Sequence, residues 1–169
     1  APENHYVRIK ADNKLEAKGT LTGQFTITAE GQSDSNIRRI FTTGFQSEWK
    51  STMERQLLAI SPKARLLSVD YGKNPKDYQA APIKITFRYE IPDYALKGEG
   101  EMFFRPMVMN NLYNQVRSYM WIDTSVENRK YGFKDACSRL VELDETVQLP
   151  AGYKLVSAVK DETMQGVGA

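Results

Sequence analysis

Cysteine and histidine are nearly absent from this sequence, which contains one of each, Cys137 and His5. Zinc sites in proteins draw three or four ligands mainly from these two residue types, so a site of that kind is excluded. A catalytic thiol needs a base within hydrogen-bonding reach, and a histidine this close to the start of the chain is poorly held for that role. We therefore expect Cys137 to be a structural thiol, and the chain to have no enzymatic activity, metal or cofactor.

Long apolar runs and a strong net charge are also missing. No run approaches the roughly 18 residues that a membrane-spanning helix requires, so the sequence predicts no membrane span. The formal net charge is +2, and the lysines and arginines are scattered along the chain. Nucleic-acid binding typically needs a concentrated basic stripe, so we expect no nucleic-acid partner.

What the sequence does contain is a regular alternation of apolar and polar residues in LEAKGTLTGQFTITAEG, residues 15–31. Every odd position from Leu15 to Ala29 is apolar or glycine, which indicates one long β-strand with a single solvated face. Gly19 and Gly23 fall on the inward face, where a missing side chain marks a bulge, a bend or the close approach of another backbone. We therefore expect antiparallel β structure that is packed on one side.

Two helices are expected after this alternating segment. The first runs from an N-cap at Ser33 or Asp34 to a stop at Gly44. The second runs from about Ser47 to Ile60, and Pro62 closes it. Its apolar positions recur at helical spacing, so this helix should lie across a sheet with one stripe buried. That stripe consists of Trp49, Met53 and Leu57.

The rest of the chain returns to the two-residue period of β-strands. The expected strands are ARLLSVDY, PIKITFRYEI, its antiparallel partner ALKGEGEMFFRP, RSYMWID, SRLVELDETVQLP and YKLVSAV. The predicted fold class is therefore mostly β, an antiparallel β-sandwich with a short helical insertion near residues 34–61. A length of 169 residues suits one domain spanning residues 1–169. Because the chain begins at Ala1 rather than Met, we expect it to be a fragment or the C-terminal part of a larger protein.

Glu99 and Glu101 are the carboxylates considered for catalysis. Two residues apart on one strand, they would share a face with Cβ atoms roughly 7 Å apart, a spacing compatible with glycoside hydrolysis. Glycines at positions 98 and 100 flank this pair, and such a segment is more often a solvated strand beside a turn. An autonomous glycoside hydrolase is therefore the least favoured hypothesis.

Aromatic residues in RSYMWID give the strongest binding signal. Alternation places Arg117, Tyr119 and Trp121 on one face of the expected strand. Flat aromatic rings beside a charged group suit a glycan or peptide platform, through stacking and directed hydrogen bonds. The alternative, that a loop or another domain covers Trp121, is the more common situation for such a residue.

Three segments resemble a known family. KGTLTGQFTITAEG with the following IRRIF, RKYGF at 129–133 and VQLPAGYKLVS at 147–157 are similar to the C-terminal β-sandwich domain of bacterial three-domain transglutaminase-like proteins. The resemblance implies an exported protein, periplasmic or on the cell surface, with a papain-like transglutaminase core upstream. The family's catalytic cysteine, histidine and aspartate lie in that core, and Cys137 does not match their motif.

The resemblance and the residues together give three hypotheses. The first is a non-catalytic accessory domain that packs against, or assists, the upstream transglutaminase-like domain of the same polypeptide. The second is a glycan- or peptide-binding β-sandwich module that uses Arg117, Tyr119 and Trp121. The third is the hydrolase that uses Glu99 and Glu101.

Overall fold

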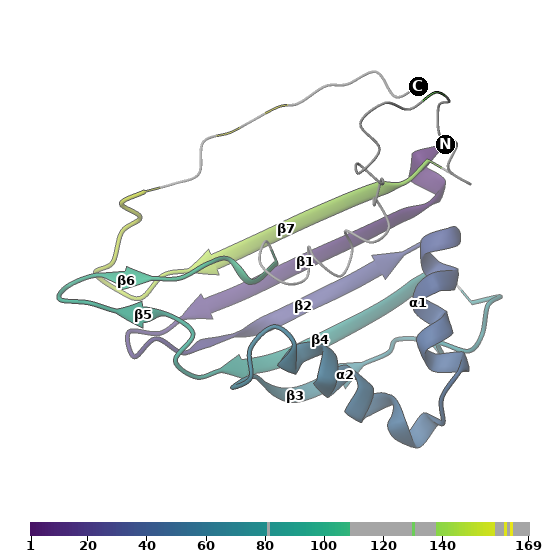
Figure 1. Ribbon diagram of the computed structural model, residues 1–169, viewed down its shortest axis with the longest axis horizontal. Helices are drawn as coiled ribbons and strands as arrows, with labels where there is room; N and C mark the ends of the chain where they lie inside the picture. Colours follow the sequence, from purple (N-terminus) through teal and green to yellow (C-terminus); the bar gives the residue numbers. More distant parts are fainter. Residues whose placement is uncertain (81, 109–129, 131–137, 158–160, 162, 164–169) are drawn as a thin grey trace.

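The computed structural model describes residues 1–80, 82–108, 130, 138–157, 161 and 163. Seven strands, two α-helices and two short 3-10 helices lie in these ranges (Figure 1). In chain order they are η1 (Pro2–Asn4), β1 (Tyr6–Leu15), β2 (Leu21–Ala29), α1 (Gln32–Thr42), η2 (Gln46–Glu48), α2 (Trp49–Leu58), β3 (Arg65–Asp70), β4 (Ile83–Ile91), β5 (Leu96–Lys97), β6 (Met102–Phe103) and β7 (Leu140–Gln148).

Five of the strands form one sheet in the order β3-β4-β2-β1-β7, and β5 pairs with β6 in a second, two-stranded sheet. This mostly β, sandwich-like architecture with an early helical insertion confirms the predicted fold class. The large sheet is mixed, because β7 runs parallel to β1 while the other pairs are antiparallel. Most of the chain separates β1 from β7. A connection this long lets β7 run parallel to β1, whereas a short hairpin would make the two strands antiparallel.

The alternating segment at 15–29 is two strands rather than the single strand that the pattern predicts. The chain reverses at residues 16–20, where Glu16 N–H donates to the Thr20 carbonyl at 2.9 Å and Gly19 has φ +91°. The alternation continues through the turn because Leu15 and Leu21 are cross-strand partners on the same face. Gly19 therefore marks a bend, which is one of the roles expected of it.

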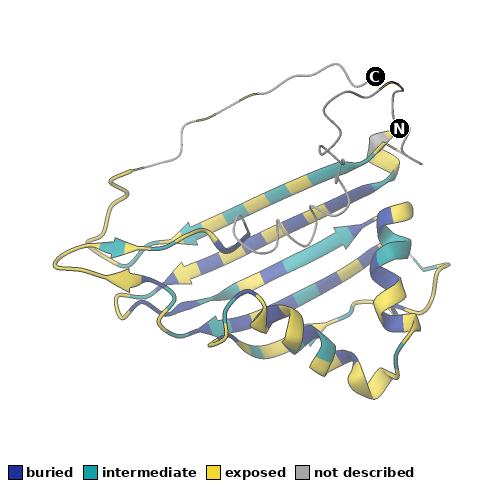
Figure 2. Cartoon of the chain, viewed as in Figure 1, coloured by how far each residue is buried: buried dark blue, intermediate teal, exposed yellow. Residues whose placement is uncertain are grey.

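Both helices lie on one face of the large sheet, and Figure 2 shows the strands alternating between buried and exposed positions. The predicted stripe of α2 is confirmed, since Trp49, Met53 and Leu57 are all buried. Phe41 of α1 and Tyr71 after β3 complete this packing, with both rings edge-on to Trp49 at centroid distances of 5.1 and 5.4 Å. Among the described residues, no helix has the length and apolar character needed to cross a membrane.

The opposite face of the sheet carries polar and charged side chains. In its centre the hydroxyl oxygens of Thr26 and Thr86 lie 3.0 Å apart, and at one margin Arg8 pairs with Glu142. The register confirms that odd positions of β1 and β2 face the helices while even positions face away. The sheet is therefore packed on one side, as the alternation predicts.

Two expected strands are wrong or incomplete. Residues 95–106 do not pair with β4, whose partners are β2 and β3, but fold back on themselves as the β5–β6 hairpin. Glycines at 98 and 100 permit this turn, and Gly100 has φ +75°. Residues 153–157 form no strand, and the expected strand at 117–123 lies outside the described residues.

Candidate functional site

Most residues predicted for binding cannot be placed. Arg117, Tyr119, Trp121 and Cys137 all lie outside the described residues, so the glycan or peptide platform stays a prediction. Glu99 and Glu101 are described, and both are exposed in the turn between β5 and β6. The shared strand face on which the carboxylate hypothesis depends is therefore wrong.

His5 supports the start of α1. Its Nδ1 accepts a hydrogen bond from the Gln32 backbone N–H at 3.1 Å. The preceding residue, Gly31, has φ +62°, and a Cβ there would collide with the imidazole ring. The sequence predicts a cap at Ser33 or Asp34 and is wrong on this point, because the acceptor comes from a residue 27 positions away.

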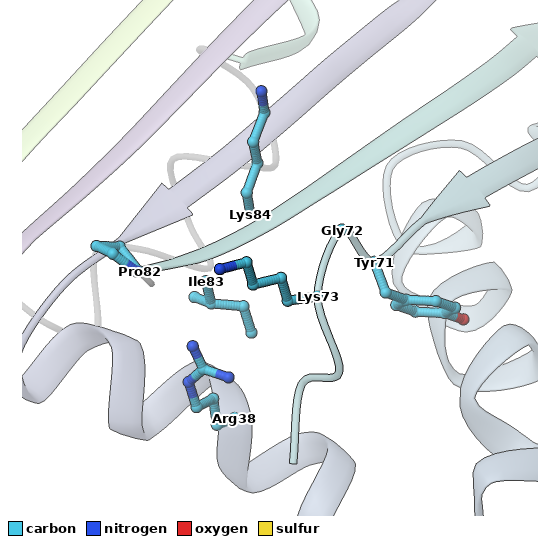
Figure 3. A pocket seen from close by; sticks show the side chains of 7 residues that line it. All are labelled: Arg38, Tyr71, Gly72, Lys73, Pro82, Ile83 and Lys84. Carbon is cyan, nitrogen blue, oxygen red and sulfur yellow. The ribbon is translucent and has the colours of Figure 1, made fainter. Parts of the chain in front are cut away.

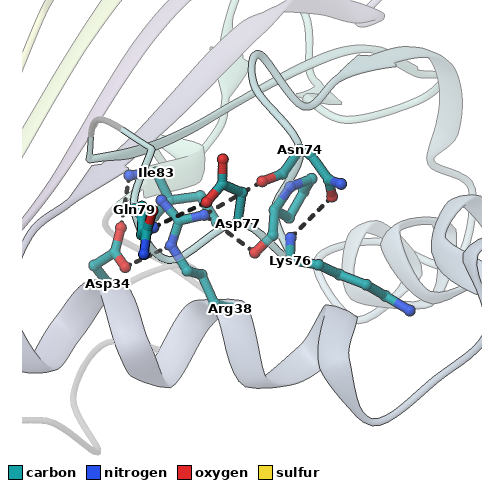
Figure 4. Close-up of polar contacts among 8 residues, drawn as sticks. Asp34, Arg38, Asn74, Lys76, Asp77, Gln79 and Ile83 are labelled. Carbon is teal, nitrogen blue, oxygen red and sulfur yellow. Dashed lines mark hydrogen bonds and ion pairs between the residues drawn. The ribbon is translucent and has the colours of Figure 1, made fainter.

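The first polar cluster of interest connects α1 to the segment between β3 and β4 (Figure 4). The Asp34 carboxylate accepts from Arg38 Nε at 2.6 Å through one oxygen and from the Ile83 backbone N–H at 2.7 Å through the other. Arg38 is 2% exposed, and its Nη1 also donates to the Pro75 carbonyl at 3.1 Å. A buried guanidinium thus holds the loop backbone against the helix, and the carboxylate balances its charge.

The same loop is stabilised by its own side chains. Asp70, Asn74 and Asp77 each accept a backbone N–H two residues ahead, at 2.8 to 3.0 Å, as side-chain-capped turns do. Arg38 also lies over the Tyr78 ring, 5.8 Å from its centroid. The loop is therefore defined at several points along its length.

A cavity of about 250 Å³ lies between this loop, α1 and the start of β4 (Figure 3). Its lining residues are Arg38, Tyr71, Gly72, Lys73, Pro82, Ile83 and Lys84. Three of the lining residues are cationic and none is acidic. The lining surface is nonetheless mostly apolar, because aliphatic and aromatic carbon atoms supply most of it.

Tyr71 connects the cavity with the core. Its ring packs edge-on against Phe41 and Trp49, and its hydroxyl oxygen is buried without a hydrogen-bond partner among the described residues. Burial disfavours the phenolate and so raises the pKa of Tyr71 above its usual value.

A second polar cluster crosses the packed face of the sheet. Tyr89 on β4 donates its hydroxyl hydrogen to Asn13 Oδ1 on β1, across Gly23 of the intervening strand β2. A Cβ at Gly23 would collide with the Asn13 side chain, so this is the close approach that the sequence predicts for an inward glycine. Asn13 Nδ2 in turn donates to Glu145 Oε1 at 2.8 Å.

Glu145 ends this network on β7. Its carboxylate also accepts the backbone N–H groups of Met107 and Val108, at 3.0 and 2.7 Å. The pKa of Tyr89 is raised strongly, first by burial and then by the negative charge of Glu145. The same two causes raise the pKa of Tyr94 to about 12. The cluster thus keeps neutral phenols beside a carboxylate.

The β5–β6 hairpin presents exposed apolar side chains. Leu96 and Phe103 are cross-strand partners, and they are 75% and 59% exposed. Exposed charged residues surround the pair: Lys97, Glu99, Glu101 and Arg105. An apolar centre with a charged surround is the usual layout of a protein interface.

Within the described ranges, no group of three or more histidine, cysteine, aspartate or glutamate residues is placed to hold a metal ion. Comparison of the chain with protein-family models, curated proteins and solved structures gives no match. Function must therefore be argued from the residues themselves.

Proposed function

We propose that this chain is a non-catalytic accessory domain of an exported transglutaminase-like protein, and that it docks on the upstream catalytic domain through the β5–β6 hairpin. The family part of the proposal rests on the three segments that resemble such domains. The docking part rests on one observation, the exposed cross-strand pair Leu96 and Phe103.

The energetic reason is the cost of leaving large apolar side chains in water. Full burial of a leucine or phenylalanine side chain stabilises a complex by about 1.5 to 3 kcal/mol. A turn hydrogen bond from Gly98 N–H to the Glu101 carbonyl, at 3.0 Å, closes the hairpin and fixes its backbone before any partner arrives. A pre-formed backbone reduces the ordering cost of binding, although the two side chains still lose rotamer freedom when they are buried.

The roles of the reactive residue types also support a non-catalytic domain. His5 caps α1, Asp34 and Arg38 hold the loop before β4, and Glu145 holds the backbone at residues 107 and 108. Each of these groups serves a structural contact. The β5–β6 hairpin differs from these groups, because it places two exposed apolar side chains, Leu96 and Phe103, opposite each other as a cross-strand pair.

The test begins with the complete reading frame that encodes this chain. We expect a Cys-His-Asp core upstream, and we expect that core, produced separately, to bind this chain. Replacing both Leu96 and Phe103 by serine should weaken the binding at least tenfold in a calorimetric titration. Phe45→Ser is the matched control, because Phe45 is 76% exposed and lies at the N-cap of η2, in the segment that joins α1 to α2 rather than in the hairpin.

Two results would overturn the proposal. One is a reading frame without an upstream catalytic core. The other is unchanged affinity in the double hairpin variant, or an equal loss in Phe45→Ser. Melting curves of the variants should stay close to that of the wild type, since both hairpin side chains are exposed.

A further inference from the structure

The cavity between α1, the loop after β3 and the start of β4 has a composition that suits a particular ligand. We infer that it binds a small organic monoanion, a carboxylate on an apolar body. This inference does not depend on the docking function proposed above, because the cavity and the β5–β6 hairpin lie in different parts of the fold (Figure 1).

The charge at the cavity favours one negative group. Figure 3 shows Arg38 and Lys73 beside Ile83, whereas the ammonium end of Lys84 points away. Asp34 pairs with Arg38 and uses its second oxygen on the Ile83 N–H, so it balances one of the two positive charges. Asp70 is a second carboxylate near the cavity, but it is exposed to solvent and accepts the Gly72 N–H. Lys73 forms no ion pair among the described residues and is the cation left for a ligand, which matches a carboxylate better than a doubly charged phosphate.

The rest of the lining suits an apolar body. Ile83 is buried and contributes aliphatic surface, and Pro82 adds more. The volume of about 250 Å³ equals that of roughly eight liquid water molecules. It lies below the usual range for drug-sized ligands, so a nucleotide or an oligosaccharide is too large and a compound with a single ring fits.

The cavity wall is formed before any ligand binds. Arg38 fixes the loop through the Pro75 carbonyl, and Asp70 fixes the turn at Gly72 with a hydrogen bond of 2.8 Å. Gly72 has φ +61°, and a Cβ there would lie 3.1 Å from the Lys84 carbonyl oxygen, so the loop approaches β4 closely at this point. A pre-formed wall reduces the ordering cost of binding.

Benzoate and its uncharged analogue benzamide test the inference as a matched pair. In amide-detected NMR titrations of the whole chain, benzoate should cause saturable shifts at Gly72, Lys73 and Ile83. Benzamide should bind at least fivefold more weakly. Lys73→Gln should weaken benzoate binding about fivefold, which corresponds to about 1 kcal/mol.

Lys76→Gln is the control for this variant, because Lys76 is an exposed lysine of the same loop that does not line the cavity. It should leave benzoate affinity within twofold of the wild type. The inference is overturned if benzoate causes no saturable shifts, if benzamide binds equally well, or if both lysine variants lose affinity equally. The double serine variant of Leu96 and Phe103 should still bind benzoate, which separates this result from the docking proposal.

Discussion

Arg38 and Glu145 are charged residues on the helix-covered side of the sheet, near opposite ends, and they are satisfied in different ways. Arg38 has a counter-ion, Asp34, one helical turn away, and donates to a backbone carbonyl of the loop before β4. Glu145 forms no ion pair among the described residues and accepts three N–H hydrogen bonds from neutral groups.

Both residues hold irregular backbone against the packed face of the sheet, one through a positive charge and the other through a negative charge. An irregular segment that crosses a packed face needs partners for its backbone groups, because water cannot reach them. The guanidinium supplies donors to carbonyls, and the carboxylate supplies acceptors to N–H groups. The difference is that removal of Asp34 takes away an ion-pair partner of a buried cation, whereas removal of the Glu145 charge affects only neutral donors.

The largest effect is therefore expected from Asp34→Ala. This change removes the carboxylate that pairs with Arg38, a residue only 2% exposed, and it removes the acceptor of the Ile83 N–H. The free energy of unfolding should fall by about 3 to 5 kcal/mol. Urea denaturation measures this loss, and a change below about 1 kcal/mol would show that the ion pair does not hold the loop.

Glu145→Gln should cost less, about 2 kcal/mol. Glutamine keeps one carbonyl acceptor, but its amide N–H₂ takes the place of the other oxygen and faces either the Val108 N–H or the donors of Met107 and Asn13, so at least one hydrogen bond to a charged acceptor is lost. Glu142→Gln is the matched control, because Glu142 is half exposed and pairs with Arg8 on the face of the sheet that points away from the helices. Its effect should stay within about 0.5 kcal/mol, and equal losses in the two variants would contradict the role given to Glu145.

Gly23→Ala tests the network that ends at Glu145. It asks whether the hydrogen bond between Asn13 on β1 and Tyr89 on β4 needs the space that a glycine leaves on the intervening strand β2. The added methyl group collides with the Asn13 side chain and should cost about 1 to 3 kcal/mol. An Asn13→Ala background should relieve only the part of this cost that comes from the Asn13 side chain, because the added Cβ also approaches the Asp12 carbonyl oxygen and the Asn13 Cα within 3.0 Å. A double-mutant cycle measures the coupling, and additive effects would show that the two residues do not interact.

A gradual loss of stability is expected at alkaline pH. The pKa values of Tyr89 and Tyr94 are raised in the folded chain, so the folded state favours the neutral phenols. The unfolded chain begins to lose these protons near pH 10, so stability should be constant below that pH and fall as the pH rises toward 12. Tyr94→Phe should reduce the slope of stability against pH above 10, and an unchanged slope would contradict this assignment.

Local patterns predicted much of this structure. The stripe of Trp49, Met53 and Leu57 follows from helical spacing alone, and the inward positions of the strands follow from alternation. The spacing of Asp34 and Arg38 also indicates an ion pair, since residues four apart share a helix face.

Contacts between distant segments could not be predicted in this way. The pattern does not show that the chain reverses after Leu15, because a hairpin leaves the alternation intact. Alternation places Glu145 on the same face of its strand as Leu143 and Val147, but it does not show the parallel register that pairs β7 with β1 and brings Glu145 to Asn13. His5 was missed as the support of α1 for the same reason, since its partner is 27 positions away.

The docking claim is tested most directly by hydrogen exchange of this chain with and without the proposed upstream catalytic domain. The account predicts slower amide exchange at residues 96–103 in the presence of that domain. Amides in the loop that Arg38 holds, at 71–80, should exchange at the same rate in both samples. Protection elsewhere without any at the hairpin, or no protection at all, would contradict the claim that this domain docks through Leu96 and Phe103.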